Sequence, residues 1–258
     1  MRGPTPGWSR PGTGAGRNRN QLIVVGVVAL LILYAISRAH SVSSFQILFF
    51  VLLVPSIILH EVSHGWVALA FGDDTAKQAG RLTLNPLRHI DPIGTVVLPV
   101  ILILSGVGAF GYAKPVPVNV RRLRSPRNQS LLVSLAGPAV NIVLMLVALL
   151  ALRVAAPAGT IPPSSYIAQG YIPASLLWEA FFTFGLGNMI LAVFNLLPLP
   201  PLDGSALLER AMPRSWWPGY LRVRMYAMPV LIVVVLLFSP IRNAVGTWAL
   251  RAWGDLLG

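Results

Sequence analysis

The chain has 258 residues, of which 55% are hydrophobic and only 11% charged, and its mean hydropathy is +0.70. Soluble domains carry about 25% charged residues, so this composition excludes an ordinary water-soluble domain and indicates a protein that lies in the lipid bilayer. The formal charge of +12 does not predict a nucleic-acid partner, because the arginines lie between apolar stretches, as in the cytoplasmic flanks of membrane helices.

The N-terminal segment differs from the rest of the chain. Residues 1–20 are rich in glycine, proline and arginine and hold too few apolar residues to bury a core, so we interpret them as a disordered basic tail. No small-residue cleavage pattern precedes Arg38, and we expect no removed signal peptide. Without internal repeats or room for an appended soluble domain, residues 21–258 are expected to form a single membrane-embedded domain.

Apolar stretches then follow one another along the chain. They are 21–37, 45–70, 93–110, 129–152, 175–200 and 226–241. A membrane helix needs about 20 apolar residues, so the second, fourth and fifth stretches are long enough to span. The third contains Pro99 and several glycines, which argue against an uninterrupted helix. We therefore expect an all-α multi-spanning membrane protein with about five to six transmembrane helices and a re-entrant segment at 93–110.

Positive charges in the connections predict the orientation. The arginines of the tail place the N-terminus in the cytoplasm of a multi-pass protein of the cell membrane. If 93–110 dips into the membrane and returns, the basic segments 111–128 and 209–224 both lie on the cytoplasmic side, and the uncharged 154–174 lies outside. A full crossing would put 111–128 outside, so the re-entrant arrangement is favoured.

The second apolar stretch carries a metal-binding pattern, reading HEVSH from His60 to His64. Histidines four residues apart project from the same face of a helix and can hold one zinc ion. Glu61 can take a proton from water that the zinc ion activates, which is the chemistry of peptide hydrolysis. Glu61 is the only charged residue between Arg38 and Asp73. Because ionisable groups at membrane depth are costly, we prefer a zinc site to a polar cluster that faces a cavity or a partner helix.

A catalytic zinc ion takes three protein ligands and leaves a fourth position open. The chain has no cysteine, and the remaining histidines, His40 and His89, flank apolar stretches and are interpreted as interfacial side chains. Asp203 is the better candidate, because it follows a proline-rich end of the fifth stretch and both this stretch and the second run towards the cytoplasm. The alternative is that Asp203 only caps the next helix, since Asp before Gly-Ser suits an N-cap.

These motifs resemble the site-2 protease family of intramembrane zinc metalloproteases, in its compact bacterial branch without a PDZ domain. The resemblance lies first in HEVSH and in NLLPLPPLDG, from Asn195 to Gly204. Four further stretches are similar: GRLTLNP at 80–86, HIDPIGT at 89–95, GYAKPVPVN at 111–119 and GPAVN at 137–141. The motif-bearing core therefore extends from about residue 46 to about residue 210.

The resemblance implies roles for individual residues. It implies His60, His64 and Asp203 as ligands of one zinc ion per chain and Glu61 as the catalytic carboxylate. It further implies that Asn195 binds substrate or the developing oxyanion, with packing between helices as the alternative.

Other residues in the motifs are interpreted as structural or adjacent to the substrate. These are Gly137, Pro138, Asn141 and Gly204, and for the first three we favour a packing role, because small residues allow close helix approach and a buried Asn can bridge neighbouring helices. The segment 80–86 resembles a small membrane-dipping β-hairpin that pairs with an unwound substrate.

We therefore expect a zinc metalloendopeptidase that cuts membrane proteins within or near their transmembrane segments, as in regulated intramembrane proteolysis, with its active site towards the cytoplasm. The expected partners are the bilayer and membrane-protein substrates, for which the resemblance suggests anti-sigma factors or remnant signal peptides. Two alternatives stay open: a transporter in which the same side chains line a metal pathway, and a catalytically idle homologue that binds membrane proteins.

Overall fold

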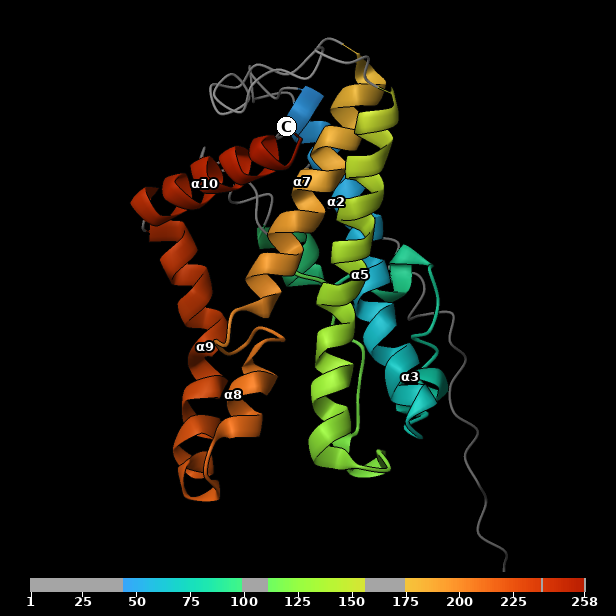
Figure 1. Ribbon diagram of the computed structural model, residues 1–258. Coiled ribbons are helices and arrows are strands. Elements are labelled where there is room, and N and C mark those ends of the chain that lie inside the picture. Colours follow the sequence, from blue (N-terminus) through green and yellow to red (C-terminus); the bar gives the residue numbers. More distant parts are fainter. Residues whose placement is uncertain (1–43, 99–110, 156–174, 238, 258) are drawn as a thin grey trace, which may run out of the picture.

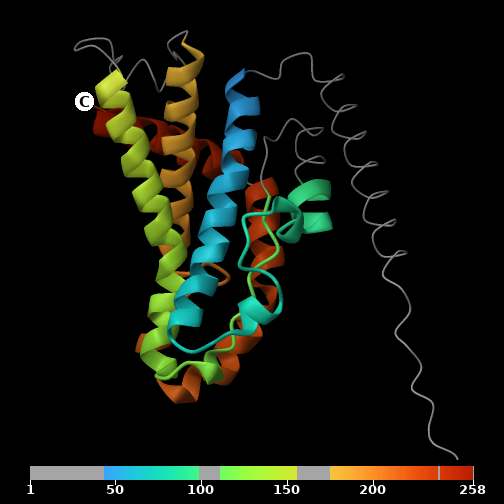
Figure 2. The ribbon, with the colours of Figure 1, turned by 90° about the vertical axis from the view of Figure 1, so that its right-hand side faces the viewer.

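Three long helices form the centre of the structure, a computed structural model that describes residues 44–98, 111–155, 175–237 and 239–257. They are α2 (Ser44–Ala70), α5 (Pro126–Ala155) and α7 (Leu176–Leu196), and each packs against the other two (Figures 1 and 2). With a rise of about 1.5 Å per residue, even the shortest exceeds the roughly 30 Å of a bilayer's hydrocarbon core. All three are long and apolar enough to cross a membrane.

The outward faces of these helices are apolar. On α5, six large aliphatic side chains are at least half exposed: Leu132, Val143, Leu146, Val147, Leu150 and Val154. A soluble protein would bury such a stripe, whereas lipid solvates it without cost. The chain is therefore a membrane protein with several membrane-spanning helices, and the described part of it contains no strand.

The three helices alternate in direction. α2 and α7 run the same way and α5 runs between them in the opposite sense (Figures 1 and 2). The end of α2 and the start of α5 meet, because the Arg124 N–H donates to the Phe71 carbonyl at 3.2 Å. The segment between these helices thus returns to the end of the bundle that it left. Residues 99–110, where the re-entrant turn is predicted, lie outside the described residues, as do 1–43.

The two basic segments predicted to share the cytoplasm also meet. The Arg127 guanidinium donates to the Arg210 carbonyl at 3.0 Å, which links the start of α5 to the end of α8 (Ser205–Ala211). The segment before α5 also meets the end of α2, since the Asp73 carboxylate accepts the Asn119 N–H at 2.6 Å and Arg122 forms an ion pair with Asp74 at 2.7 Å. Basic residues of both predicted cytoplasmic segments therefore lie at the same end of the bundle.

The predicted β-hairpin at 80–86 is wrong for this structure. This segment lies between α3 (Thr75–Gln78) and a 3-10 turn, η1 (Pro86–Arg88), and it forms no strand. Asn85 ends any extended run, because its side chain accepts the Leu87 N–H and Pro86 opens the turn. The Arg81 side chain, and not a backbone ladder, bonds to the carbonyls of Lys114 and Pro115. Further along lie a π-helix, η2 (Pro92–Val97), and a 3-10 turn, η3 (Val120–Arg122).

The last two helices close the fold on one side. After a 3-10 turn, η4 (Arg214–Trp216), α9 (Trp217–Leu237) contains most of the predicted stretch 226–241, and α10 (Ser239–Leu257) crosses the bundle near the start of α7 (Figure 1). Trp253 of α10 is fully buried against Phe182 of α7 and Leu152 of α5. This apolar cluster fixes one end of α7, while the other end leads to the candidate site.

Candidate metal centre

The predicted ligands converge at the junction of α2, α5 and the loop after α7. His60 Nε2 lies 3.0 Å from Asp203 Oδ2, and His64 Nε2 lies 3.4 Å from the same oxygen. One ligand atom from each residue lies within 4.8 Å of the others, so a single ion can reach all three. Both histidines are buried among helices that span the membrane. That these side chains bind zinc stays a prediction.

Each histidine is oriented by a hydrogen bond at its other ring nitrogen. His60 Nδ1 lies 2.5 Å from Asn141 Oδ1, and His64 Nδ1 lies 2.7 Å from the Val133 carbonyl oxygen. A carbonyl can only accept, so His64 carries a proton on Nδ1. A neutral His64 ring then directs the lone pair of Nε2 towards Asp203, which is the arrangement that metal-binding histidines use.

Asp203 is positioned by a tight loop between α7 and α8. The Gly204 N–H donates to the Asn195 carbonyl at 2.6 Å, which folds the loop back onto the end of α7. A Cβ at Gly204 would meet the Leu197 carbonyl oxygen at 2.5 Å, so only glycine fits. The N-cap of α8 is Gly204, without a side-chain cap hydrogen bond, so the helix-cap alternative for Asp203 is not what this loop presents.

The carboxylate of Asp203 has an unusual environment. Its Oδ2 atom is buried and makes no hydrogen bond within the described residues, although two imidazole nitrogens face it. A buried carboxylate oxygen without a hydrogen-bond donor, facing two imidazole nitrogens, is a donor set that a cation completes.

Gly137 of α5 forms the wall behind both imidazoles. A Cβ at this position would lie 2.5 Å from His60 Nε2 and 2.6 Å from His64 Nε2. The backbone of α5 therefore approaches the ligand atoms more closely than any side chain would allow. Pro138, the next residue, is fully buried. The packing role predicted for Gly137 thus concerns the ligand rings themselves.

Glu61 lies on α2 beside His60 and is held by a different segment. Its Oε2 accepts the Val116 N–H at 3.0 Å, and Val116 belongs to the proline-flanked stretch that Arg81 fastens through the Lys114 carbonyl. Gly65 permits this approach, since a Cβ there would lie 2.9 Å from a Val116 methyl group. One carboxylate oxygen of Glu61 is therefore fixed by the backbone.

Asn195 does not point freely into the site. Its Nδ2 donates to the Leu191 carbonyl at 3.0 Å, one turn back in α7, while its own carbonyl accepts the Gly204 N–H. In this arrangement Asn195 stabilises the loop that contains Asp203. Its role towards a substrate stays a prediction.

Sequence reasoning missed several contributors. Asn188 of α7 is fully buried and bonds to Asn141, and it could have been found as a polar residue inside an apolar helix. The backbone groups of Val133 and Val116 carry no side-chain signal. His89, interpreted as interfacial, is buried and bonds through Nε2 to the Thr83 carbonyl at 2.8 Å. His40 lies outside the described residues.

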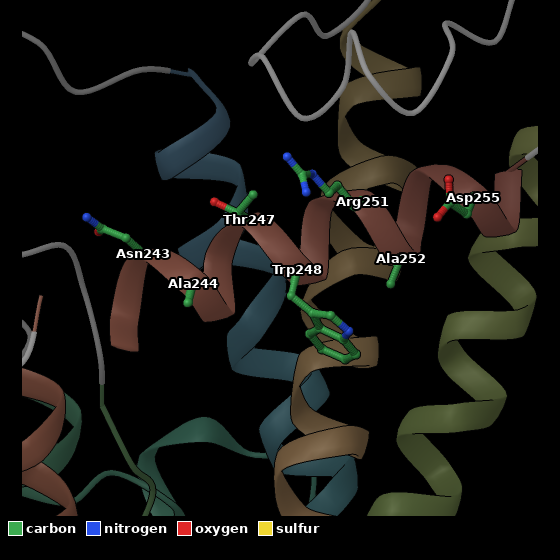
Figure 3. A pocket seen from close by; sticks show the side chains of 7 residues that line it. All are labelled: Asn243, Ala244, Thr247, Trp248, Arg251, Ala252 and Asp255. Atoms are coloured by element: carbon green, nitrogen blue, oxygen red, sulfur yellow. The ribbon is translucent and has the colours of Figure 1, made fainter. Parts of the chain in front are cut away.

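A hollow of about 520 Å³ lies along one face of α10 (Figure 3). Its polar side chains, among them Asn243, Arg251 and Asp255, all come from that single helix. α10 crosses the end of the bundle where α7 begins, whereas Asp203 follows the opposite end of α7 (Figure 1). The hollow is therefore separate from the candidate metal centre.

Comparison with known proteins gives a consistent result. The family described as "Peptidase family M50" matches residues 48–160 and 156–238. The chain is 38% identical over 194 residues to "Putative zinc metalloprotease YwhC" of Bacillus subtilis, covering 75% of this chain and 81% of that protein. It is 34% identical over 190 residues to "Putative zinc metalloprotease Rip2" of Mycolicibacterium smegmatis, covering 73% of this chain and 65% of that protein.

A more distant relative is "Zinc metalloprotease MJ0392" of Methanocaldococcus jannaschii, 23% identical over 222 residues, which are 85% of this chain and 50% of that protein. No solved structure matches the chain.

Proposed function

The chain belongs to peptidase family M50, the site-2 protease family, and from this premise we propose that it is an intramembrane zinc metalloprotease that hydrolyses peptide bonds within or near transmembrane segments. The observation that carries the proposal is the convergence of His60 Nε2, His64 Nε2 and Asp203 Oδ2 at a buried point between membrane-spanning helices. Glu61 lies beside them on α2 and supplies the carboxylate that hydrolysis needs.

The donor set fits zinc. Two imidazole nitrogens and one carboxylate oxygen are ligands that zinc accepts, and three protein ligands leave the open position typical of catalytic sites. The buried Asp203 Oδ2 atom has no hydrogen-bond donor in the described structure, and Gly137 keeps the space beside both Nε2 atoms free of a side chain. His60, His64 and Asp203 would hold one zinc ion per chain.

The chain's own residues then have separate roles in the reaction. When bound, zinc acts as a Lewis acid and lowers the pKa of water to about 7. The Val116 N–H holds Oε2 of Glu61, so the second oxygen, Oε1, takes the proton of the attacking water and returns it to the leaving amine. Asn195 would donate its amide to the developing oxyanion after leaving the Leu191 carbonyl.

The substrate must come to the site as an unwound segment. The carbonyls of a membrane helix are engaged in its own hydrogen bonds, so a peptide bond becomes available only where the helix opens. We propose membrane proteins as the substrates, with anti-sigma factors and remnant signal peptides as the suggested classes.

The charge distribution supports a location for the site. The basic residues near Arg127 and Arg210 lie at the end of the bundle to which α2 and α7 both run. By the positive-inside rule this end faces the cytoplasm, and the metal centre would open towards it in a protein of the cell membrane. In this arrangement residues 21–258 act as one membrane domain, with a re-entrant segment at 93–110 among five to six spans and with the tail 1–20 in the cytoplasm.

Two rival functions make different predictions. A transporter needs a succession of ionisable groups along a route, whereas the described residues form one cluster that could hold a metal, made of two His and one Asp. An idle homologue would hold zinc without cleaving anything. Activity measurements separate this second rival from a protease.

The test is Glu61→Gln beside the wild type, each reconstituted in lipid vesicles with a tagged single-span reporter whose helix contains a central Gly-Gly pair. We expect the variant to retain one zinc ion per chain and to lose cleavage by at least about a thousandfold, because the amide cannot take the proton. Cleavage by Glu61→Gln at a wild-type rate would rule out the mechanism. A wild type that binds zinc but leaves this reporter and β-casein uncut would favour the idle homologue.

A further inference from the structure

Four buried polar side chains connect the three central helices to the metal centre. Asn188 of α7 bonds to Ser56 of α2 at 3.0 Å, Asn141 of α5 bonds to Asn188 at 2.8 Å, and His60 of α2 bonds to Asn141 at 2.5 Å. All four are at most 6% exposed. Polar groups inside membrane helices are costly unless they are hydrogen-bonded, and a connected series of them calls for a reason beyond packing.

The direction of every hydrogen bond in this series follows from one backbone carbonyl. Asn188 Nδ2 lies 2.8 Å from the Phe184 carbonyl oxygen, which can only accept, so the NH₂ group of Asn188 must face it. The Oδ1 atom of Asn188 then faces Asn141 and accepts from its Nδ2. Asn141 consequently presents Oδ1 to His60, and the proton of that bond must lie on His60 Nδ1.

Ser56 does not disturb this order. Its hydroxyl donates to the Leu52 carbonyl at 3.0 Å and thus accepts from Asn188 Nδ2. Both donors of the Asn188 amide are therefore used, and reversing either amide would bring two acceptors or two donors face to face. The series has one consistent direction, from His60 through Asn141 to Asn188 and Phe184.

We propose that Asn188 is a positioning residue that fixes the tautomer of His60, holding its proton on Nδ1 and its lone pair on Nε2, the atom that faces Asp203. The proposal rests on the proposed function in that the lone pair serves zinc. Asn188 itself touches neither the ion nor the substrate. Partners that fix the tautomer and orientation of a ligating histidine commonly affect metal affinity by 10–100-fold.

His60 and His64 differ in the group that fixes the tautomer of the ring. His64 Nδ1 donates to the Val133 carbonyl, a backbone group that cannot rotate. His60 relies on the Asn141 side chain, whose amide can turn by 180° and offer either oxygen or nitrogen. Asn188 prevents that rotation. The tautomer of His60 should therefore depend on position 188, and that of His64 should not.

The test uses ¹⁵N NMR of the zinc-free, detergent-solubilised full chain labelled in its four histidines, at a pH where the rings are neutral. The variant is Asn188→Leu, which removes both the donor and the acceptor of the amide. Thr183→Val is the matched control, because Thr183 is a buried polar residue of α7 whose hydroxyl makes no hydrogen bond within the described residues. Zinc affinity is measured on the same proteins by competition with a chelator.

In the wild type we expect His60 to carry its proton on Nδ1. In Asn188→Leu, His60 becomes a mixture of tautomers, His64 is unchanged, and the dissociation constant for zinc rises about tenfold or more. The dissociation constant of Thr183→Val for zinc stays within about threefold of the wild-type value.

Two results would overturn the proposal. One is a wild-type His60 with its proton on Nε2, which needs no variant and therefore decides the matter even if Asn188→Leu fails to fold. The other is a folded Asn188→Leu protein whose His60 tautomer and zinc affinity match those of the wild type. The NMR measurement requires neither zinc nor proteolysis. Its result on the His60 tautomer would therefore still hold if the protein proved not to be a protease.

Discussion

Replacing Gly137 by alanine should remove the metal centre while leaving the bundle folded. The added Cβ would lie 2.5 Å from His60 Cε1 and Nε2 and 2.6 Å from His64 Nε2, whereas ordinary van der Waals contact begins at 3.4 Å. Each ring must therefore move by about 0.9 Å, or α5 must withdraw by the same amount. Protein ligands of zinc tolerate displacements of about 0.2 Å.

Either movement costs free energy. Both rings are anchored at Nδ1, by Asn141 and by the Val133 carbonyl, and these two acceptors lie on the same helix as residue 137. Pushing the rings away from α5 stretches both hydrogen bonds together. We expect zinc affinity to fall by at least about a hundredfold, equivalent to about 2.7 kcal/mol, and stability to fall by the 1–3 kcal/mol typical of overpacking.

The assay is chelator competition on the detergent-purified protein, with thermal unfolding followed by circular dichroism. Gly187→Ala is the matched control on a neighbouring span, because its Cβ would meet Phe49 at 3.6 Å, an ordinary contact. Gly185→Ala collides with the Trp253 ring and serves as an overpacked variant within the apolar cluster of α7 and α10, which should lose stability but retain zinc. If Gly137→Ala bound zinc within about threefold of the wild type, the close approach of α5 to the ligand rings would be refuted.

Further predictions concern the ligands and the loop that begins after α2. His64→Ala and Asp203→Ala should each lower zinc content well below one ion per chain, and full zinc in Asp203→Ala by elemental analysis would return that residue to a structural role. Burial alone would raise the pKa of Asp73, but hydrogen bonds from Thr75 and from the Asn119 N–H lower it below its ordinary value. The ionised Asp73 carboxylate therefore stabilises the fold above the unfolded-state pKa of about 4, and this stability is lost as the pH falls through the lower folded-state value. Asp73→Asn should lower the melting temperature at pH 7. The difference in melting temperature between this variant and the wild type should shrink as the pH falls below 4. A difference that does not depend on pH would contradict the role given to the ionised Asp73 carboxylate.

Part of the candidate site could be predicted from the spacing of residues along the sequence. His60 and His64 are four residues apart, and helical geometry alone puts them on one face of α2. Asp203 could be selected because acids are scarce in this chain and because α2 and α7 were expected to run in the same direction, as they do. Helices at 45–70, 129–152 and 175–200 were readable for the same kind of reason, since the length and apolarity of a span are properties of one segment.

The conformation of segments that depend on distant partners could not be predicted from the sequence. The stretch 80–86 was expected as a hairpin, but whether a strand forms depends on what lies beside it, and here the Arg81 side chain and the turn at Asn85 use the available groups. The apolar stretch 175–200 extends beyond its helix, because α7 ends at Leu196, before the proline-rich segment begins.

The membrane location and the metal-binding pattern of this protein could be predicted from its sequence, because hydropathy and the spacing of two histidines are local quantities. The atoms that complete the centre are known only from the way the helices pack. The Val133 carbonyl that orients His64 is 69 positions away in the chain, and the Asn141 amide that orients His60 is 81 positions away. Such contacts are set by how α5 packs against α2, and the absence of a side chain at Gly137 lets that packing come close enough.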